Sequence, residues 1–86
     1  MHAYTGEESR RIATLYCELR DEPGVLSSLI TALYRSGGNI LTINQNIPVD
    51  GVAPVTVSLR AGDSHDLVPQ IKALTGVVSV RLLAND

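Results

Sequence analysis

The residues best suited to bind a small ligand lie around a Pro-Gly pair in the segment 21–26, which reads DEPGVL. Pro23 suits the first position of a helix, because its missing N–H would have no partner there. Unpaired N–H groups at such a helix start form a partly positive site for a carboxylate. Here they belong to Gly24, Val25 and Leu26. The Asp21 carboxylate is close enough in sequence to bind an amino group beside them.

Amide side chains follow in the segment 39–46, which reads NILTINQN. Asn39, Asn44 and Gln45 supply donors and acceptors that recognise a zwitterion by hydrogen bonds. The two charged groups of a free amino acid are about 2.5 Å apart, so one molecule can bridge a narrow cleft. A structural interpretation stays open: Asp21 caps the helix, the Pro-Gly pair is only a turn, and the amides form a solvated strand face.

Catalytic residues are not grouped anywhere in the sequence. His2 and His65 are far from Cys17 and Ser27, and no nucleophile–base or metal-ligand spacing occurs. Cys17 is the only cysteine and lies on an alternating apolar pattern, which is typical of a small core side chain. We therefore expect no enzyme activity, no metal and no cofactor.

The elements that would position these residues alternate between two periods. Segments 11–19, 40–47, 55–59 and 77–83 alternate apolar and polar residues, as strands do. Apolar spacing predicts one helix from Pro23 to Gly37 and a second between about Asp66, a candidate N-cap, and Gly76, with Pro69 in its first turn. The Asp50-Gly51 pair predicts a hairpin turn. Pro54 should lie at a strand end, or where its nitrogen needs no partner.

The resulting order βαββαβ predicts an α+β fold of the ferredoxin-like type. Both helices cover one face of a four-stranded antiparallel sheet, whose first and third strands are adjacent and whose second and fourth lie at the edges. The apolar residues expected to face inward from the first helix and the second and fourth strands are Leu26, Leu29, Ile30, Leu33, Tyr34, Leu41, Ile43, Ile47, Val78, Val80 and Leu82. The open face should mix Thr and Asn with Ile12, Tyr16, Val77 and Leu83.

Composition limits the function classes. With 86 residues the chain forms one domain with a modest core, which favours association with a second copy. We expect a flexible tail over residues 1–10 and the domain over residues 11–84. A net charge of −2 gives no electrostatic reason to bind nucleic acid or an anionic membrane. Without a membrane-span pattern or a signal-peptide core, the expected location is the cytoplasm.

The pattern DEPGVLSSL, then GGNILTINQN, the PVDG turn and the final GVVSV resembles an ACT domain over residues 11–83. The NILTINQNIP stretch is most similar to the carboxy-terminal ACT domains of small bacterial proteins described as chorismate mutases or as homoserine-dehydrogenase-like. The resemblance implies a regulatory module of amino-acid biosynthesis that works as a homodimer. It holds an amino acid such as phenylalanine, threonine or serine between the first loop of one chain and the second strand of the other.

Carried over to this sequence, the resemblance implies two sets of ligand-binding residues. The first-loop contacts are Asp21, Pro23, Gly24, Val25 and Leu26. The strand contacts are Asn39, Ile40, Asn44 and Gln45.

Three alternatives remain open on the sequence alone. A purely structural dimerisation module would need the same open face and strand edge but no ligand. A fragment of a chorismate mutase or homoserine dehydrogenase would need catalytic groups, yet Arg20, Arg35 and Arg60 lie on separate elements. An RNA-binding module of the same fold would stack bases on aromatic residues, and this chain has neither Phe nor Trp.

Overall fold

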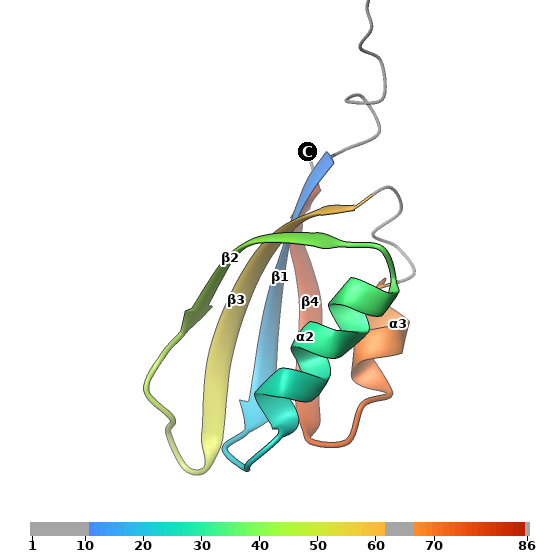
Figure 1. Ribbon diagram of the computed structural model, residues 1–86. Coiled ribbons are helices and arrows are strands. Elements are labelled where there is room, and N and C mark those ends of the chain that lie inside the picture. The colour runs from blue at the N-terminus through green and yellow to red at the C-terminus, as the bar shows by residue number, and fades with distance from the viewer. Residues whose placement is uncertain (1–10, 62–66, 86) are drawn as a thin grey trace, which may run out of the picture.

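The residues that the structure describes form four antiparallel strands and two helices (Figure 1). The computed structural model describes residues 11–61 and 67–85. The elements are β1 (Arg11–Arg20), α2 (Val25–Arg35), β2 (Asn39–Gln45), β3 (Val52–Ala61), α3 (Leu67–Lys72) and β4 (Val77–Asn85). The sheet order is β2-β3-β1-β4, and both helices cover one face. The predicted ferredoxin-like fold is confirmed. The proposed tail 1–10, His2, His65 and the Asp66 cap lie outside the described residues.

The core lies between the helices and the two central strands. Every second residue of β1 and β3 turns to this side and is at most 2% exposed, and the helices cover them with fully or almost fully buried leucine and isoleucine side chains. These residues are Ala13, Leu15, Cys17, Leu19, Ala53, Val55, Val57, Leu59, Leu29, Leu33, Leu67 and Ile71. Each buried leucine stabilises the fold by about 1.5–3 kcal/mol relative to an exposed one. This layer holds α2 against the sheet.

Both edge strands carry β-bulges, and these correct several predicted faces. In β2 the pairing shifts between Ile40 and Thr42, so Leu41 is the extra residue and is 42% exposed. Ile40 and Ile43 consequently both pack against the core. The prediction that Leu41, Ile43 and Ile47 share a buried face is therefore wrong for Leu41, and also for Ile47, which follows the end of β2.

In β4 the pairing with β1 shifts twice, at Val78 and at Leu83, and both side chains are exposed. The shift at Val78 turns Val77 to the core side, so the predicted assignment of these two valines is reversed. An extra residue in a strand inverts the alternation beyond it, which a strict period of two does not anticipate. In α2, Tyr34 is 61% exposed rather than part of the buried stripe.

The open face of the sheet mixes polar and apolar side chains as predicted, with Val78 exposed in place of Val77. Ser79 donates a hydrogen bond to Glu18 Oε1 (2.7 Å), and the Arg81 guanidinium lies 5.5 Å from the centroid of the Tyr16 ring. The hydroxyls of Thr14 and Ser58 are 3.3 Å apart. Such cross-strand pairs stabilise the sheet beside the exposed apolar side chains of Ile12, Val78 and Leu83.

The β2–β3 connection ends in the predicted hairpin. Val49 and Val52 exchange backbone hydrogen bonds of 2.9 and 3.1 Å across Asp50 and Gly51, whose φ angles are 54° and 77°. Two positive φ angles are typical of a type I′ turn. Pro54 lies within β3, where its carbonyl accepts from the N–H of Asn46 just beyond β2. Its nitrogen therefore faces the side where β2 has ended, as expected.

Candidate functional site

The first loop joins β1 to α2 and is held to the hairpin by its backbone. The Asp21 N–H donates to the Gly51 carbonyl (2.9 Å), and the Glu22 N–H donates to the Arg20 carbonyl (2.9 Å). Pro23 lies in the turn, one residue before the N-cap, so the prediction that it begins the helix is wrong. The N-cap is Gly24, in the left-handed conformation (φ 87°, ψ −12°).

The start of α2 keeps backbone donors without acceptors. No side chain caps it, so the interpretation in which Asp21 caps the helix is also wrong. The Val25 N–H donates weakly to the Glu22 carbonyl (3.3 Å), which removes one of the three predicted donors. Within the described residues, the N–H groups of Gly24, Leu26 and Ser27 have no backbone acceptor. The helix start therefore keeps unpaired donors beside an exposed loop, where an anion can accept their hydrogen bonds.

Space around Gly24 is free on the side where a side chain would project. A Cβ atom placed there has no heavy atom within 4 Å. The inner side of the same corner is closed, because a Cβ on Gly76 would lie 2.7 Å from a methyl of Val25. The loop is thus fixed from within and open to solvent.

The predicted β2 contacts lie far from the first loop of the same chain. The loop meets β3 at Gly51, whereas Asn39 pairs with Arg60 and Asn44 with Thr56. At about 3.3 Å per residue, Asn39 is about 30 Å along β3 from Gly51, and Asn44 about 17 Å. Neither amide can share an amino acid with the first loop of its own chain.

The nine predicted residues thus fall into separate groups. The loop group lies together at one end of the sheet; Asn39 lies at the opposite end of β2 from Gln45. Asn39, Asn44 and Gln45 are exposed, and the Ile40 side chain packs against the core. A joint site therefore requires the β2 of a second chain, and such a site stays a prediction.

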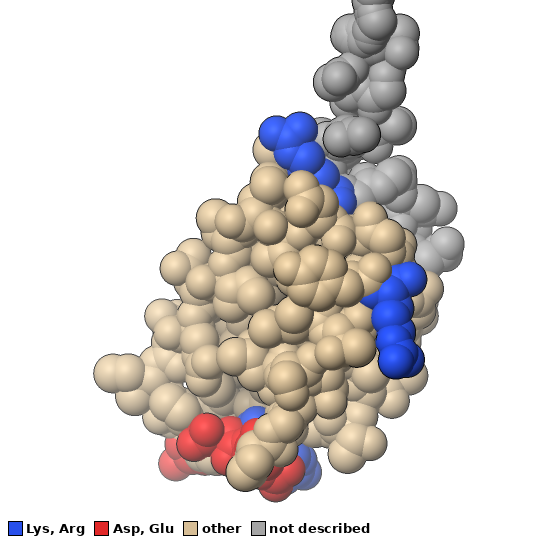
Figure 2. Space-filling view, viewed as in Figure 1, with Lys and Arg blue, Asp and Glu red and all other residues tan. Residues whose placement is uncertain are grey.

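Acidic side chains gather at the end of the molecule that carries the first loop. Figure 2 shows red carboxylates gathered at the lower end, with blue atoms of basic side chains among them and further basic groups farther up. Asp21 and Glu22 belong to the loop, and Asp50 belongs to the hairpin bonded to it. This charge favours a ligand's ammonium group, so a ligand carboxylate at the same place depends on the N–H groups of the helix start.

Cys17 takes no part in this site. Its side chain is fully buried beneath the helices, and burial raises the pKa of its thiol from 9.0 to about 11. A thiol of this kind is protonated at neutral pH and is a poor nucleophile. Within the described residues, no group of three His, Cys, Asp or Glu side chains is arranged to hold a metal ion, and no helix is long and apolar enough to cross a membrane.

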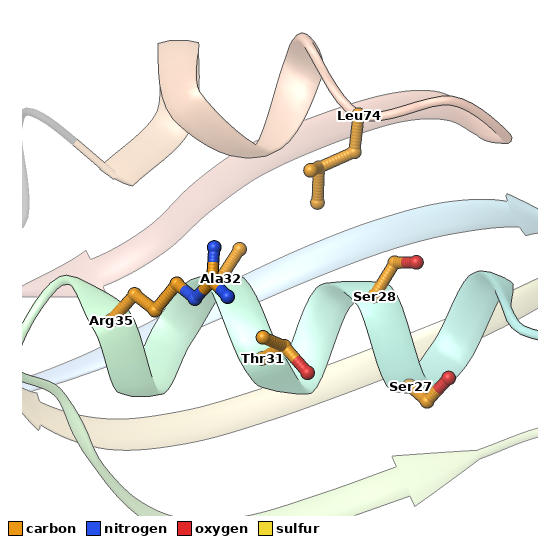
Figure 3. A pocket seen from close by; sticks show the side chains of 6 residues that line it. All are labelled: Ser27, Ser28, Thr31, Ala32, Arg35 and Leu74. Atoms are coloured by element: carbon orange, nitrogen blue, oxygen red, sulfur yellow. The ribbon is translucent and has the colours of Figure 1, made fainter.

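A groove on the outer side of α2 was not anticipated. It encloses about 340 Å³ and is lined by Ser27, Ser28, Thr31, Ala32, Arg35 and Leu74 (Figure 3). The sequence pattern places the four polar residues among them on the solvent side of the helix. It gives no sign that Leu74, which follows α3, approaches them to form a second wall.

Comparison with known proteins supports the fold and indicates the family. The family model described as ACT domain matches residues 13–76. The ACT domain from the GTP pyrophosphokinase of Chlorobium tepidum superposes with a TM-score of 0.73 at 19% identity, covering 86% of this chain and 99% of that one. The regulatory subunit of aspartate kinase from Thermus thermophilus has a TM-score of 0.68 at 14% identity, covering 87% and 51%.

Curated relatives are longer than this chain. A UPF0735 ACT domain-containing protein from Caldicellulosiruptor saccharolyticus is 40% identical over 85 residues, which cover 93% of this chain and 57% of the relative. The chain thus spans little more than half the length of that relative. Its name contains neither chorismate mutase nor homoserine dehydrogenase, so that part of the expected resemblance must be corrected.

Proposed function

Because this chain belongs to the ACT domain family, we propose that it is a regulatory module that binds a free amino acid between two copies of itself. The observation that carries the proposal is the exposed start of α2, where Gly24 leaves open space and the N–H groups of Gly24 and Leu26 lack backbone acceptors in the described residues. The ligand carboxylate accepts from these N–H groups, and the Asp21 carboxylate holds its ammonium group.

The second half of the site comes from β2 of the partner copy. An amino acid is too small to reach from the first loop to Asn44 or Gln45 of the same chain, whereas the exposed edge of β2 is available to another chain. A ligand that contacts both copies stabilises the pair by its preference for the paired state. Coupling of about 1–3 kcal/mol is sufficient for regulation.

Exposed apolar side chains near β2 support association of two copies. Leu41 is 42% exposed, and Ile47 and Val49, in the connection to the hairpin, are 84% and 67% exposed. The same residues would serve a dimerisation module without a ligand, so ligand dependence decides between the two functions. The cytoplasmic location remains a prediction.

A thermal-shift screen of the 86-residue chain against all twenty amino acids tests ligand binding. Ligand at 100 times its dissociation constant adds about 2.7 kcal/mol. At about 4–8 °C per kcal/mol for a domain of this size, the melting temperature rises by about 10–20 °C. The rise should disappear in Gly24→Trp, because the indole fills the space above the free N–H groups. A flat response to every amino acid would refute sensing by this chain.

Gly37→Trp is the matched control. Gly37 lies at the other end of α2, has the same φ of 87° and likewise has no heavy atom within 4 Å of a Cβ. Both variants therefore place a tryptophan at the same positive φ, and only Gly24→Trp blocks the proposed site. Molar mass by light scattering, with and without the amino acid that shifts melting, then distinguishes a ligand-linked dimer from a constitutive one.

A further inference from the structure

The groove on α2 is separate from the site proposed above. Its floor and one wall come from α2, and its other wall is Leu74 between α3 and β4 (Figure 3). The proposed amino-acid site instead combines the first loop, residues 21–26, with β2 of a partner copy, and none of these residues lines the groove. A ligand in the groove therefore has its own contacts.

The charge of the groove is positive and local. Among its lining residues Arg35 is the only charged side chain, and none is acidic. Ser28 and Thr31 contribute hydroxyl groups, which can donate hydrogen bonds to anions, whereas the Ser27 hydroxyl donates to the Gly24 carbonyl. Arg35 brings a planar guanidinium that can bind a carboxylate or phosphate through two parallel hydrogen bonds. This combination is suited to an anionic group.

Helix geometry brings these groups to one place. Arg35 and Ser28 are seven residues apart, hence about 10.5 Å along the axis and on nearly the same side of the helix. Helical side chains lean toward the N-terminus, so an arginine covers most of the distance to the preceding turns. Figure 3 shows the guanidinium lying back along α2 beside Ala32, with the Ser28 hydroxyl farther along the same side.

The opposite wall is apolar and is held by backbone hydrogen bonds. The Leu74 N–H donates to the Ile71 carbonyl (3.0 Å), and its own carbonyl accepts from Val77 (3.3 Å). The Leu74 side chain points toward α2 in Figure 3 and packs partly against the core. With Ala32 it gives a ligand an apolar surface beside the charged contact.

We propose that this groove binds a small organic anion, whose carboxylate or phosphate lies between Arg35 and the hydroxyls of Ser28 and Thr31 and whose apolar part contacts Leu74. Charge complementarity supports this occupant, since a guanidinium and the hydroxyls of Ser28 and Thr31 line the groove, and no carboxylate is among its lining residues in the described part of the chain. Its size agrees, because about 340 Å³ is in the range of small-molecule sites.

Amide NMR titrations with benzoate, acetate, phenyl phosphate and inorganic phosphate, at constant ionic strength, test the proposal. We expect saturable shifts at Ser28, Thr31, Ala32 and Arg35. Benzoate should bind more tightly than acetate, and phenyl phosphate more tightly than inorganic phosphate. Leu74→Ala should remove both differences. Whether the carboxylates or the phosphates bind more tightly identifies the anionic group. Shifts that do not saturate, or that follow protein concentration because a second copy occupies the groove, would overturn the proposal.

Variants of the cationic residue separate a site from general attraction. Arg35→Gln should weaken binding at least tenfold, and Arg35→Lys should restore it only in part, because a lysine cannot form the paired hydrogen bonds. Lys72→Gln on α3 removes the same charge from an exposed residue outside the groove lining and should leave affinity within twofold. Equal losses in Arg35→Gln and Lys72→Gln would refute a specific site.

Gly24→Trp should leave the groove titrations unchanged, because Gly24 is not among the lining residues of the groove. Failure of the amino-acid site is therefore distinguishable from failure of the groove site.

Discussion

The two ends of α2 are both formed by glycine, and they differ in what remains unpaired around them. At the C-terminal end, Gly37 donates to the Tyr34 carbonyl and Gly38 to the Leu33 carbonyl, both at 3.0 Å. This is the pattern of a Schellman motif, which satisfies the last carbonyls of a helix. At the N-terminal end, Gly24 has no side-chain cap, and in the described residues the N–H groups of Gly24, Leu26 and Ser27 lack backbone acceptors.

Surroundings differ as much as hydrogen bonding does. A Cβ on Gly38 would lie 2.6 Å from a methyl of Leu59 and 3.1 Å from the Leu33 carbonyl oxygen, so this end is packed against the sheet. A Cβ on Gly24 would meet nothing within 4 Å. Packing requires a glycine at position 38, whereas at position 24 only the backbone conformation requires one. Only the end at Gly24 leaves room and donors for a ligand.

The largest expected effect is on the free energy of unfolding, and it separates the packing requirement at Gly38 from the conformational requirement at Gly24. Gly38→Ala should lower the free energy of unfolding by about 2–3 kcal/mol, because the buried Leu59 cannot move aside freely. Gly24→Ala should cost about 1–2 kcal/mol, from the left-handed backbone only. Urea unfolding of both variants measures the difference. In a Leu59→Val background, which removes the contacting methyl, the Gly38→Ala cost should shrink. Equal costs for Gly24→Ala and Gly38→Ala would show that packing does not distinguish the two ends.

How far the sequence predicts these two ends follows from the kind of interaction involved. The Gly-Gly break and the Pro-Gly turn are local signals, so the positions of both ends and the strand order were predictable. Whether a Cβ at Gly38 would contact Leu59 depends on how closely β3 packs against this end of α2, and no local sequence pattern encodes that distance. The same holds for Pro23, which lies before the helix because Gly24 has a positive φ and takes the cap position.

The β-bulges limit prediction of the candidate site for a related reason. Leu41 shifts the alternation in β2, so Ile40 turns to the core while Asn39 and Asn44 stay exposed. Such a shift depends on pairing with β3 and is invisible in the strand's own sequence. The groove at Arg35 was missed because its second wall, Leu74, comes from a segment about 40 residues later.

Reactivity of Cys17 reports which end of α2 opens the core more readily. The thiol is fully buried, and burial raises its pKa to about 11, so alkylation requires opening. Under native conditions, iodoacetamide should label Gly38→Ala about fivefold faster than Gly24→Ala, which corresponds to about 1 kcal/mol in opening free energy.

The same thiol makes stability depend on pH, because it ionises near pH 9.0 in the unfolded chain and near 11 in the folded one. Stability should therefore fall across this window, since the unfolded state then binds fewer protons. Cys17→Ala should show a smaller fall over the same range.

The smallest effect compares one serine from each end. The Ser36 hydroxyl donates to the Leu33 carbonyl at 2.8 Å in a partly buried position, and the Ser27 hydroxyl donates to the Gly24 carbonyl at 3.1 Å in an exposed one. Ser36→Ala should cost about 0.5–1.5 kcal/mol, because the hydroxyl completes an end whose carbonyls are otherwise paired. Ser27→Ala should change stability by less than about 0.5 kcal/mol, because water replaces the lost hydroxyl at an exposed site. Urea midpoints of the two variants measured together resolve the difference. A larger loss in Ser27→Ala would mean that the N-terminal end is held by its own contacts rather than left open for a ligand.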